Sequence, residues 1–345
     1  METATTPSCQ TPDDRAAVQP PLDELDRKIL TQAQVDFPIS RWPYEVLGAR
    51  LDCEGQEVLR RVRRLCEAGV IRRLGGVFSP SRLGYVSTLV AAKVSPGRLG
   101  AVAAEVSREP GVTHNYAREH EYNLWFTLTA RSAAELDAAV LRLGGLEGVE
   151  GYNPLPATAA YKTSAVFVLD GSTPPSAPAP AGPWAGAVRI NDGEKALIRL
   201  VQGSLPLEAR PLVSLAERWG RPVEILIVCL RHWLAAGLMR RFGAVLSHRR
   251  VGMSANGLAL FRAHAEGADR AGAALAGRPE VSHCYLRRGP EGWRWNLFAM
   301  FHGADRQAVR ALVAELAGRE GLGSHEVLFS TVEYKKTSMR FFDDD

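Results

Sequence analysis

The densest run of side chains that could do chemistry extends from His114 to Trp125, in the segment HNYAREHEYNLW. If its first half forms a strand, alternate residues point to the same face, and His114, Tyr116 and Arg118 make one row. His120 then lies in the tight turn that follows. Histidine donates a proton near neutral pH, and an arginine guanidinium binds a carboxylate through two parallel hydrogen bonds. The pattern therefore predicts a site that binds carboxylates and transfers protons.

The same row occurs a second time, further along the chain, as His283, Tyr285 and Arg287. Further polar and aromatic side chains next to the two rows complete the expected substrate-binding lining: Asn123, Trp125, Arg288, Trp295 and Asn296. A cationic and aromatic lining suits a large, flat, conjugated ligand that carries several carboxylates. The alternative for each residue taken singly is a structural role, because isolated histidines and aromatic residues often cover a sheet face or an interface.

The two rows belong to a duplication of nearly the whole chain. The motif RRLGGVFSPSRLG at residues 72–84 recurs as RRFGAVLSHRRVG at residues 240–252, and KTS occurs at residues 162–164 and again at 336–338. Residues 170–188, between the copies, are rich in proline, alanine and glycine, which is typical of an extended linker. The sequence therefore predicts a tandem repeat.

Each copy is expected to contain two domains. In the first copy, apolar residues at helical spacing predict helices over residues 22–35 and 55–68, and residues 70–78 predict the strand hairpin of a wing. The remainder predicts the order βαββαβ of a ferredoxin-like sheet. The expected fold class is α+β, a tandem repeat of a winged helix-turn-helix domain and a ferredoxin-like domain. The expected bounds are a disordered tail at 1–21, winged helix-turn-helix domains at 22–85 and 189–253 (the second degenerate), and ferredoxin-like domains at 86–169 and 254–345.

The basic second helix of the first copy raises the alternative of a DNA-binding regulator. The arginines within Arg60–Arg64 lie on one face of this helix, where they could contact phosphates. The equivalent helix of the second copy, residues 224–233, reads EILIVCLRHW, which is apolar nearly all round and predicts a buried element. A symmetric DNA reader presents two equivalent recognition helices. This asymmetry therefore disfavours sequence-specific binding of nucleic acid.

The overall composition is that of an ordinary globular protein. The 345 residues carry a net charge of +4, which fits a nucleic acid or a polyanionic small molecule and alone selects neither. The five cysteines include no CxxC pair, and His114 and His120 have no third metal ligand at a fitting spacing, so neither a disulfide framework nor a metal site is expected. No apolar run approaches the roughly 20 residues of a membrane helix. We therefore expect a cytoplasmic protein that does not bind membranes.

The segments HNYAREHEYNLWFTL and RRLGGVFSPSRLGY in the first copy, and SHCYLRR followed by WRWNLFAMFHG in the second, resemble siroheme decarboxylases, an enzyme family with an Lrp/AsnC-like fold. The resemblance covers roughly residues 22–168 and 189–342. Two homologous subunits usually pair in this family, and sometimes they are fused. The resemblance thus implies that the two fused halves of this chain pair with each other.

The family's reaction is the removal of the C12 and C18 acetate side chains of siroheme as CO₂, which gives 12,18-didecarboxysiroheme for the heme d1 pathway or the alternative heme pathway. The resemblance implies that His114 and His120 are the catalytic residues and act as proton donors. No cofactor beyond the iron of the siroheme substrate is expected, because the electron pair left by CO₂ can be delocalised into the adjacent pyrrole.

The remaining site residues are assigned by their chemistry. Arg118, Arg287 and Arg288 are expected to hold carboxylates, although four further arginines could serve equally well: Arg72, Arg73, Arg240 and Arg241. The aromatic walls are expected from Tyr116, Trp125, Tyr285 and Trp295. The main pocket is expected in the first copy, because Gly289 and Pro290 stand in the second copy where His120 stands in the first. Two alternatives remain, an Lrp/AsnC-type ligand-responsive regulator and a non-catalytic tetrapyrrole carrier.

Overall fold

The computed structural model describes residues 21–163, 166–172 and 186–343. The expected tail before residue 21 and most of the expected linker lie outside the described residues. Within the described part, helices and strands alternate as an α+β fold that is repeated twice along the chain. Both the predicted fold class and the predicted duplication are therefore confirmed.

Each half begins with three helices, of which the second in each half was not located from the sequence. In the first half these are α1 (Glu24–Val35), α2 (Pro43–Arg50) and α3 (Gly55–Glu67), and in the second half α6 (Asp192–Val201), α7 (Pro211–Trp219) and α8 (Val223–Ala235). The first helix of each triplet starts with a capping box, formed by Asp23 with Asp26 and by Asn191 with Glu194. The local sequence thus sets where both triplets begin.

The expected wing hairpin is wrong. Residues Ile71–Phe78 form one strand, β1, which pairs antiparallel with the equivalent strand of the other half, β6 (Met239–Leu246), so that Gly75 lies opposite Gly243. A Cβ atom on Gly75 would lie 2.2 Å from the Gly203 carbonyl oxygen, so this strand can pass the end of α6 only with glycine. The chain after each strand forms a short 3₁₀ helix, η1 (Ser81–Leu83) or η3 (Arg249–Val251), instead of returning as a second strand.

The ferredoxin-like parts carry two outer helices each. The first part contains β2 (Val86–Val94), η2 (Pro96–Arg98), α4 (Leu99–Arg108), β3 (Val112–Arg118), β4 (Leu124–Ala130), α5 (Ala133–Gly144) and β5 (Val149–Thr163). The second contains β7 (Ala255–Phe261), α9 (Ala268–Ala276), β8 (Val281–Arg287), β9 (Leu297–Gly303), α10 (Arg306–Arg319) and β10 (His325–Lys336). The predicted βαββαβ order is confirmed in both halves.

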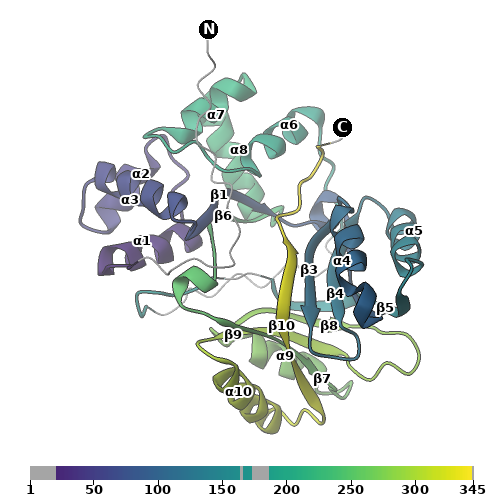
Figure 1. Ribbon diagram of the computed structural model, residues 1–345. Coiled ribbons are helices and arrows are strands. Elements are labelled where there is room, and N and C mark those ends of the chain that lie inside the picture. The colour runs from purple at the N-terminus through teal and green to yellow at the C-terminus, as the bar shows by residue number, and fades with distance from the viewer. Residues whose placement is uncertain (1–20, 164–165, 173–185, 344–345) are drawn as a thin grey trace.

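The two sheets join into one closed barrel in the order β10-β3-β4-β2-β5-β8-β9-β7. The first part of β5 pairs with β2 of its own half, and its last part pairs with β8 of the other half. Strand β10 does the same with β7 and then with β3. The barrel lies at one end of the molecule. The helices α1–α3 and α6–α8 lie at the other end, with β1 and β6 between them and the barrel (Figure 1). Pairing of the fused halves is thus built into the sheet.

The chain that leaves each long strand returns to the first helix of its own half. The Gln34 side chain on α1 donates to the Phe167 carbonyl at 2.9 Å and accepts from the Phe167 amide at 3.0 Å. Gln202, the C-cap residue of α6, repeats both hydrogen bonds with Phe341, at 3.1 and 2.8 Å. Both phenylalanines are buried in the core of the helical end. These two clamps tie the barrel to the helices.

We expect Gln34→Leu to lower the free energy of unfolding by about 1–3 kcal/mol, because it leaves the buried amide and carbonyl of Phe167 without partners. The measurement is the midpoint of thermal unfolding. Gln56→Leu is the matched control, since Gln56 is exposed on α3 and should leave the midpoint nearly unchanged. Equal midpoints for the two variants would contradict the role of this clamp.

Candidate functional site

The predicted rows of side chains are present on the inner side of the barrel. His114 and Tyr116 on β3 stack with ring centroids 6.3 Å apart, and the Arg118 guanidinium lies 5.5 Å from the Tyr116 ring. His283, Tyr285 and Arg287 on β8 repeat the arrangement, at 6.3 and 4.7 Å. The alternation of the strands places them there, since Asn115 between them points outward and donates to the Ala103 carbonyl of α4.

Both arginines of the rows donate to the backbone of the opposite half, Arg118 from a buried position and Arg287 from a partly exposed one. Arg118 donates to the Leu328 carbonyl of β10, and Arg287 donates to the Leu155 carbonyl of β5, both at 2.7 Å. Burial lowers the pKa of each guanidinium to about 10. Arg118 is 4% exposed. The structure therefore gives each of these arginines, which were expected to hold carboxylates, a backbone carbonyl partner in the opposite half.

Four other cations surround the two row histidines. Arg72 on β1 donates to the Lys336 carbonyl at 2.6 Å, and Lys336 pairs with His114 in the register of β10 and β3. The equivalents of Arg72 and Lys336 in the other half are Arg240 and Lys162, and both lower the pKa of His283 through their charge. We call this group the cationic end of the barrel: Arg72, Lys162, Arg240 and Lys336, with His114 and His283.

The cationic end was predicted only in part. The lysines were not identified as site residues, although the repeat of KTS at residues 162–164 and 336–338 was the signal that could have found them. The four further arginines that the sequence could not tell apart have different roles in the structure. Arg73 donates to the Gln202 carbonyl of α6, and Arg241 donates to the Gln34 carbonyl of α1. They fix the helical end, whereas Arg72 and Arg240 face the barrel.

Both row histidines are neutral at pH 7. Burial, followed by the charges of Lys336, His283 and Arg72, lowers the pKa of His114 to about 3. Burial, followed by Arg240, Arg287 and Lys162, lowers the pKa of His283 to about 4. Both residues are half-buried. An anion bound among these cations would therefore raise both pKa values.

His120 lies at the opposite end of the barrel from His114. Its Nε2 atom is 3.2 Å from a carboxylate oxygen of Glu326, at the start of β10, whereas His114 pairs with Lys336 at the end of that strand. Its Nδ1 atom accepts the Tyr122 amide at 3.0 Å. The strand from His114 to Arg118 alone spans about 13 Å at about 3.3 Å per residue, and His120 lies in the turn beyond it. The structure does not bring them to one site.

Four of the expected lining residues are engaged in the fold. Trp125 is 1% exposed and Trp295 is 4% exposed, and both pack into the apolar cluster inside the barrel. Asn123 bonds both polar groups of its side chain to the backbone of Val94, and Asn296 does the same with Ala263. The equivalent contacts in both halves show that these residues fix strand ends.

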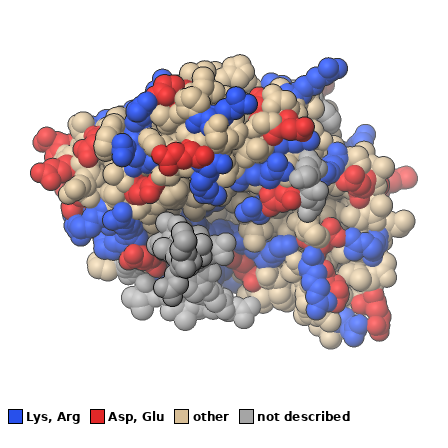
Figure 2. Space-filling model, turned by 90° about the horizontal axis from the view of Figure 1, so that it is seen from above, with Lys and Arg blue, Asp and Glu red and all other residues tan. Residues whose placement is uncertain are grey.

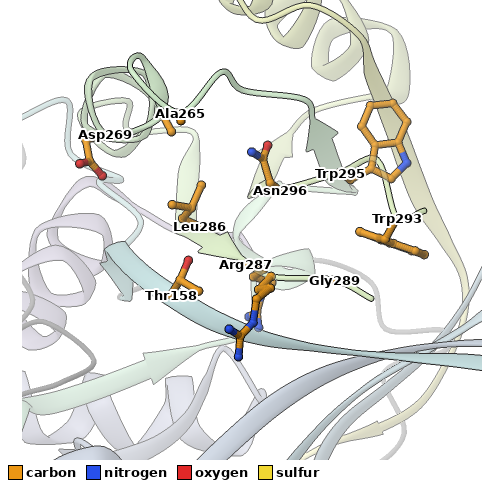
Figure 3. A pocket seen from close by; sticks show the side chains of 11 residues that line it. Thr158, Ala265, Asp269, Leu286, Arg287, Gly289, Trp293, Trp295 and Asn296 are labelled. Atoms are coloured by element: carbon orange, nitrogen blue, oxygen red, sulfur yellow. The ribbon is translucent and has the colours of Figure 1, made fainter. Parts of the chain in front are cut away.

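Arg288 lines a surface pocket of about 370 Å³ at the turn between β8 and β9, together with the predicted residues Arg287, Trp295 and Asn296 (Figure 3). Trp293 and Trp295 lie on one side of this pocket, and Asp269 of α9 lies on the other. It has no histidine in its lining, and it includes a carboxylate. The chemistry expected of the site is therefore concentrated at the cationic end.

Three of the four arginines of α3 are paired with acids of their own domain, and the fourth, Arg63, donates to the Leu207 carbonyl. Arg61 contacts Asp23, Asp26 and Glu57 at 2.6–2.9 Å, and Arg64 contacts Asp26. Lys and Arg side chains are interspersed with Asp and Glu over the face seen from the helical end (Figure 2). These ion pairs give the basic helix a structural explanation that needs no phosphate partner.

The expectation that the helix at 224–233 is buried is wrong. Helix α8 buries Val223, Leu226, Leu230 and Trp233, whereas Val228 is 62% exposed. The reason is that one face of a surface helix packs on the core, and apolar residues on the other face stay in solvent.

None of the described helices is long and apolar enough to cross a membrane. Within the described residues, no group of three His, Cys, Asp or Glu side chains is placed to hold a metal ion.

Comparison with known proteins gives the same two domains in each half. The family model of the AsnC-like ligand binding domain matches residues 82–162 and 250–335. The model of the siroheme decarboxylase NirDL-like HTH domain matches residues 26–72 and 194–240.

Relatives match the chain over its full length and over single halves. The siroheme decarboxylase of Hydrogenobacter thermophilus is 33% identical over 324 residues, which cover 94% of this chain and 96% of that protein. The siroheme decarboxylase alpha subunit of Desulfovibrio desulfuricans is 48% identical over 149 residues, 43% of this chain and 86% of that subunit. The crystal structure of the siroheme decarboxylase NirDL with an iron-uroporphyrin III analogue matches with a TM-score of 0.70 and 31% identity, covering 93% of this chain and 95% of that one. The chain therefore belongs to the siroheme decarboxylase family, as a fused form with two Lrp/AsnC-like halves.

Proposed function

We propose that this chain removes the C12 and C18 acetate groups of siroheme as CO₂ at the cationic end of the barrel, to give 12,18-didecarboxysiroheme for heme d1 or the alternative heme pathway. Two observations support the proposal. The chain belongs to the siroheme decarboxylase family, and the solved relative binds an iron-uroporphyrin III analogue. The cationic end also provides four cations beside two histidines, which suits a ligand with several carboxylates.

The observation that carries the proposal is the pair of equivalent imidazoles. His114 and His283 occupy the same position in the two halves, and each lies near a lysine and an arginine. The substrate likewise offers two acetate groups for the same reaction. One imidazole for each acetate is the simplest assignment that uses both halves.

The chemistry needs one proton for each acetate. The bond between the methylene carbon and the carboxylate carbon breaks, CO₂ leaves, and the electron pair is delocalised into the pyrrole ring. The imidazole ring of His114 or His283 then donates a proton to the methylene carbon, which becomes a methyl group. No cofactor beyond the iron of the substrate is required by this step.

The other site residues take roles that follow from their positions. Arg72, Arg240, Lys162 and Lys336 hold carboxylates, both those that leave and those that stay. Tyr116 and Tyr285 stack beside the histidines and fix the ring orientation. His120 acts through its contact with Glu326 on the stability of the turn, and it does not donate a proton to the substrate.

The reaction is tested by incubating the purified protein with siroheme without oxygen and following the product by mass. Successive loss of two CO₂ units is expected. A bound tetrapyrrole spectrum without any loss of mass would identify a carrier instead of an enzyme. Salt-sensitive retardation of promoter fragments together with unchanged siroheme would identify a regulator.

We expect His114→Ala to reduce turnover by about 10²- to 10⁴-fold, the usual contribution of a general acid, while tetrapyrrole binding persists because the surrounding cations remain. Turnover is measured by product mass, and binding by the absorption spectrum. His120→Ala is the matched comparison, and it should keep most of the turnover. If His120→Ala loses turnover and His114→Ala keeps full activity, the proton donor is His120 in the turn and not His114.

Substrate binding should be coupled to proton uptake. The row histidines are neutral at pH 7 because their pKa values are lowered to about 3 and about 4, and substrate carboxylates raise these values toward neutrality. We therefore expect net proton uptake that becomes larger as the pH falls from 8 to 6. Calorimetric titrations in buffers of different ionisation enthalpy measure it. Proton release, or no change between buffers, would contradict the role of the histidines.

A further inference from the structure

The second half carries two buried histidines that the first half lacks. His302 on β9 is 8% exposed, and His248 after β6 is 3% exposed. Thr129 and Pro80 occupy the equivalent positions in the first half, in the alignment that places Asn123 on Asn296 and Gly84 on Gly252. Neither threonine nor proline can take up and release a proton near neutral pH. The halves therefore differ in the groups behind their row histidines.

His302 is connected to the row histidine of its half through one hydroxyl group. Its Nε2 atom lies 2.8 Å from Ser282 Oγ, and Ser282 Oγ lies 3.0 Å from His283 Nδ1. Ser282 is 4% exposed. A hydroxyl group donates one hydrogen bond and accepts others, so it can receive a proton from one ring and pass its own to the other.

The path continues beyond His302 to the cationic end. The ring of His302 meets that of His248 edge to face, with centroids 5.4 Å apart, and His248 Nδ1 lies 2.8 Å from Lys336 Nζ. His302 Nδ1 and His248 Nε2 are buried and have no hydrogen-bond partner among the described residues. Buried polar atoms are nearly always paired. Two unpaired nitrogens on rings that touch each other therefore indicate a functional role.

The first half has the beginning of this path but not its continuation. Thr113 Oγ1 lies 3.0 Å from His114 Nδ1, as Ser282 does from His283. Behind Thr113 stands Thr129 in place of His302. His114 thus has the hydroxyl neighbour but no imidazole behind it.

We propose that His302 and Ser282 form a proton relay that recharges His283 after it has protonated the product carbon, a relay that His114 lacks. The inference rests on the proposed function. The neutral His283 ring, with its one proton on Nε2, gives this proton to the methylene carbon. Ser282 passes its hydroxyl proton to the free Nδ1 of His283, and His302 passes its Nε2 proton to Ser282. His302 takes up a proton from solvent at Nδ1 as it gives up the one on Nε2, so its ring stays neutral. One proton is consumed for each CO₂ released, and no oxidant or reductant is needed.

The relay makes the proton supply of the two decarboxylations different. The acetate next to His283 is protonated by an acid with a proton supply through the protein, whereas the acetate next to His114 depends on a proton from the site itself. Removing the relay should therefore slow one of the two CO₂ losses and leave the other unchanged. A purely structural His302 would affect both or neither.

His302→Gln tests the relay, because the glutamine side-chain amide can still donate to Ser282 but cannot take up a proton. We expect the loss of one CO₂ at the normal rate and the loss of the other slowed at least about tenfold, so that a single monodecarboxylated isomer accumulates. Mass spectrometry measures the accumulation, and nuclear magnetic resonance identifies the remaining acetate. Didecarboxylated product at the normal rate and without this intermediate would overturn the relay.

Variants of Ser282 give an independent test. Ser282→Ala removes the hydroxyl group and should accumulate the same isomer. Ser282→Thr keeps a hydroxyl group, as Thr113 does in the first half, and should not accumulate it. Thr129→Ser is the matched control in the first half and should behave as the unchanged protein does. If His302→Gln does not fold, as judged by its thermal unfolding, the two Ser282 variants decide alone, and equal products from both overturn the relay. Absence of any CO₂ loss from the unchanged protein would instead refute the proposed function.

Discussion

The structure depends on the exchange of the long fourth strands between the two halves. A ferredoxin-like sheet alone leaves two edges with unpaired backbone groups, and such edges need partners. The ends of β5 and β10 pair with β8 and β3 of the opposite half and close the barrel. This exchange places Lys336 beside His114 and brings Lys162 near His283. The cationic end is thus assembled only when both halves are paired.

Positively charged side chains have two different surroundings in this chain, with carboxylates next to them or without. Arg61 on α3 is surrounded by three carboxylates, and its positive charge is compensated within the domain. Burial depresses the pKa of the His114 ring, and the cations near it depress it further. The fold therefore keeps one region of positive charge in which anions replace the lost hydration. That region is where a polycarboxylate gains most from binding.

Local periodicity was enough to predict the rows on β3 and β8, because alternation along a strand needs no knowledge of the partner strand. The partners themselves follow from register between distant segments, so Lys336 and His248 could not be placed next to the rows from the sequence. For the same reason β1 was expected to pair within its own half. His120 is near His114 in sequence but far from it in space, because an extended strand separates them. The exposed face of α8 could not be foreseen from a helix that is apolar on all sides.

Fusion of the halves also affects how the site can change over time. In a dimer of identical chains every substitution occurs twice, so a histidine at the position of His302 would appear behind both row histidines. In one continuous chain the gene encodes each half separately, and Thr129 can remain while its counterpart varies. A tetrapyrrole with different substituents on its two sides can then bind in a pocket whose two sides carry different residues. The pseudo-twofold axis of the barrel therefore describes the ancestry of the backbone, while the side chains are free to depart from it.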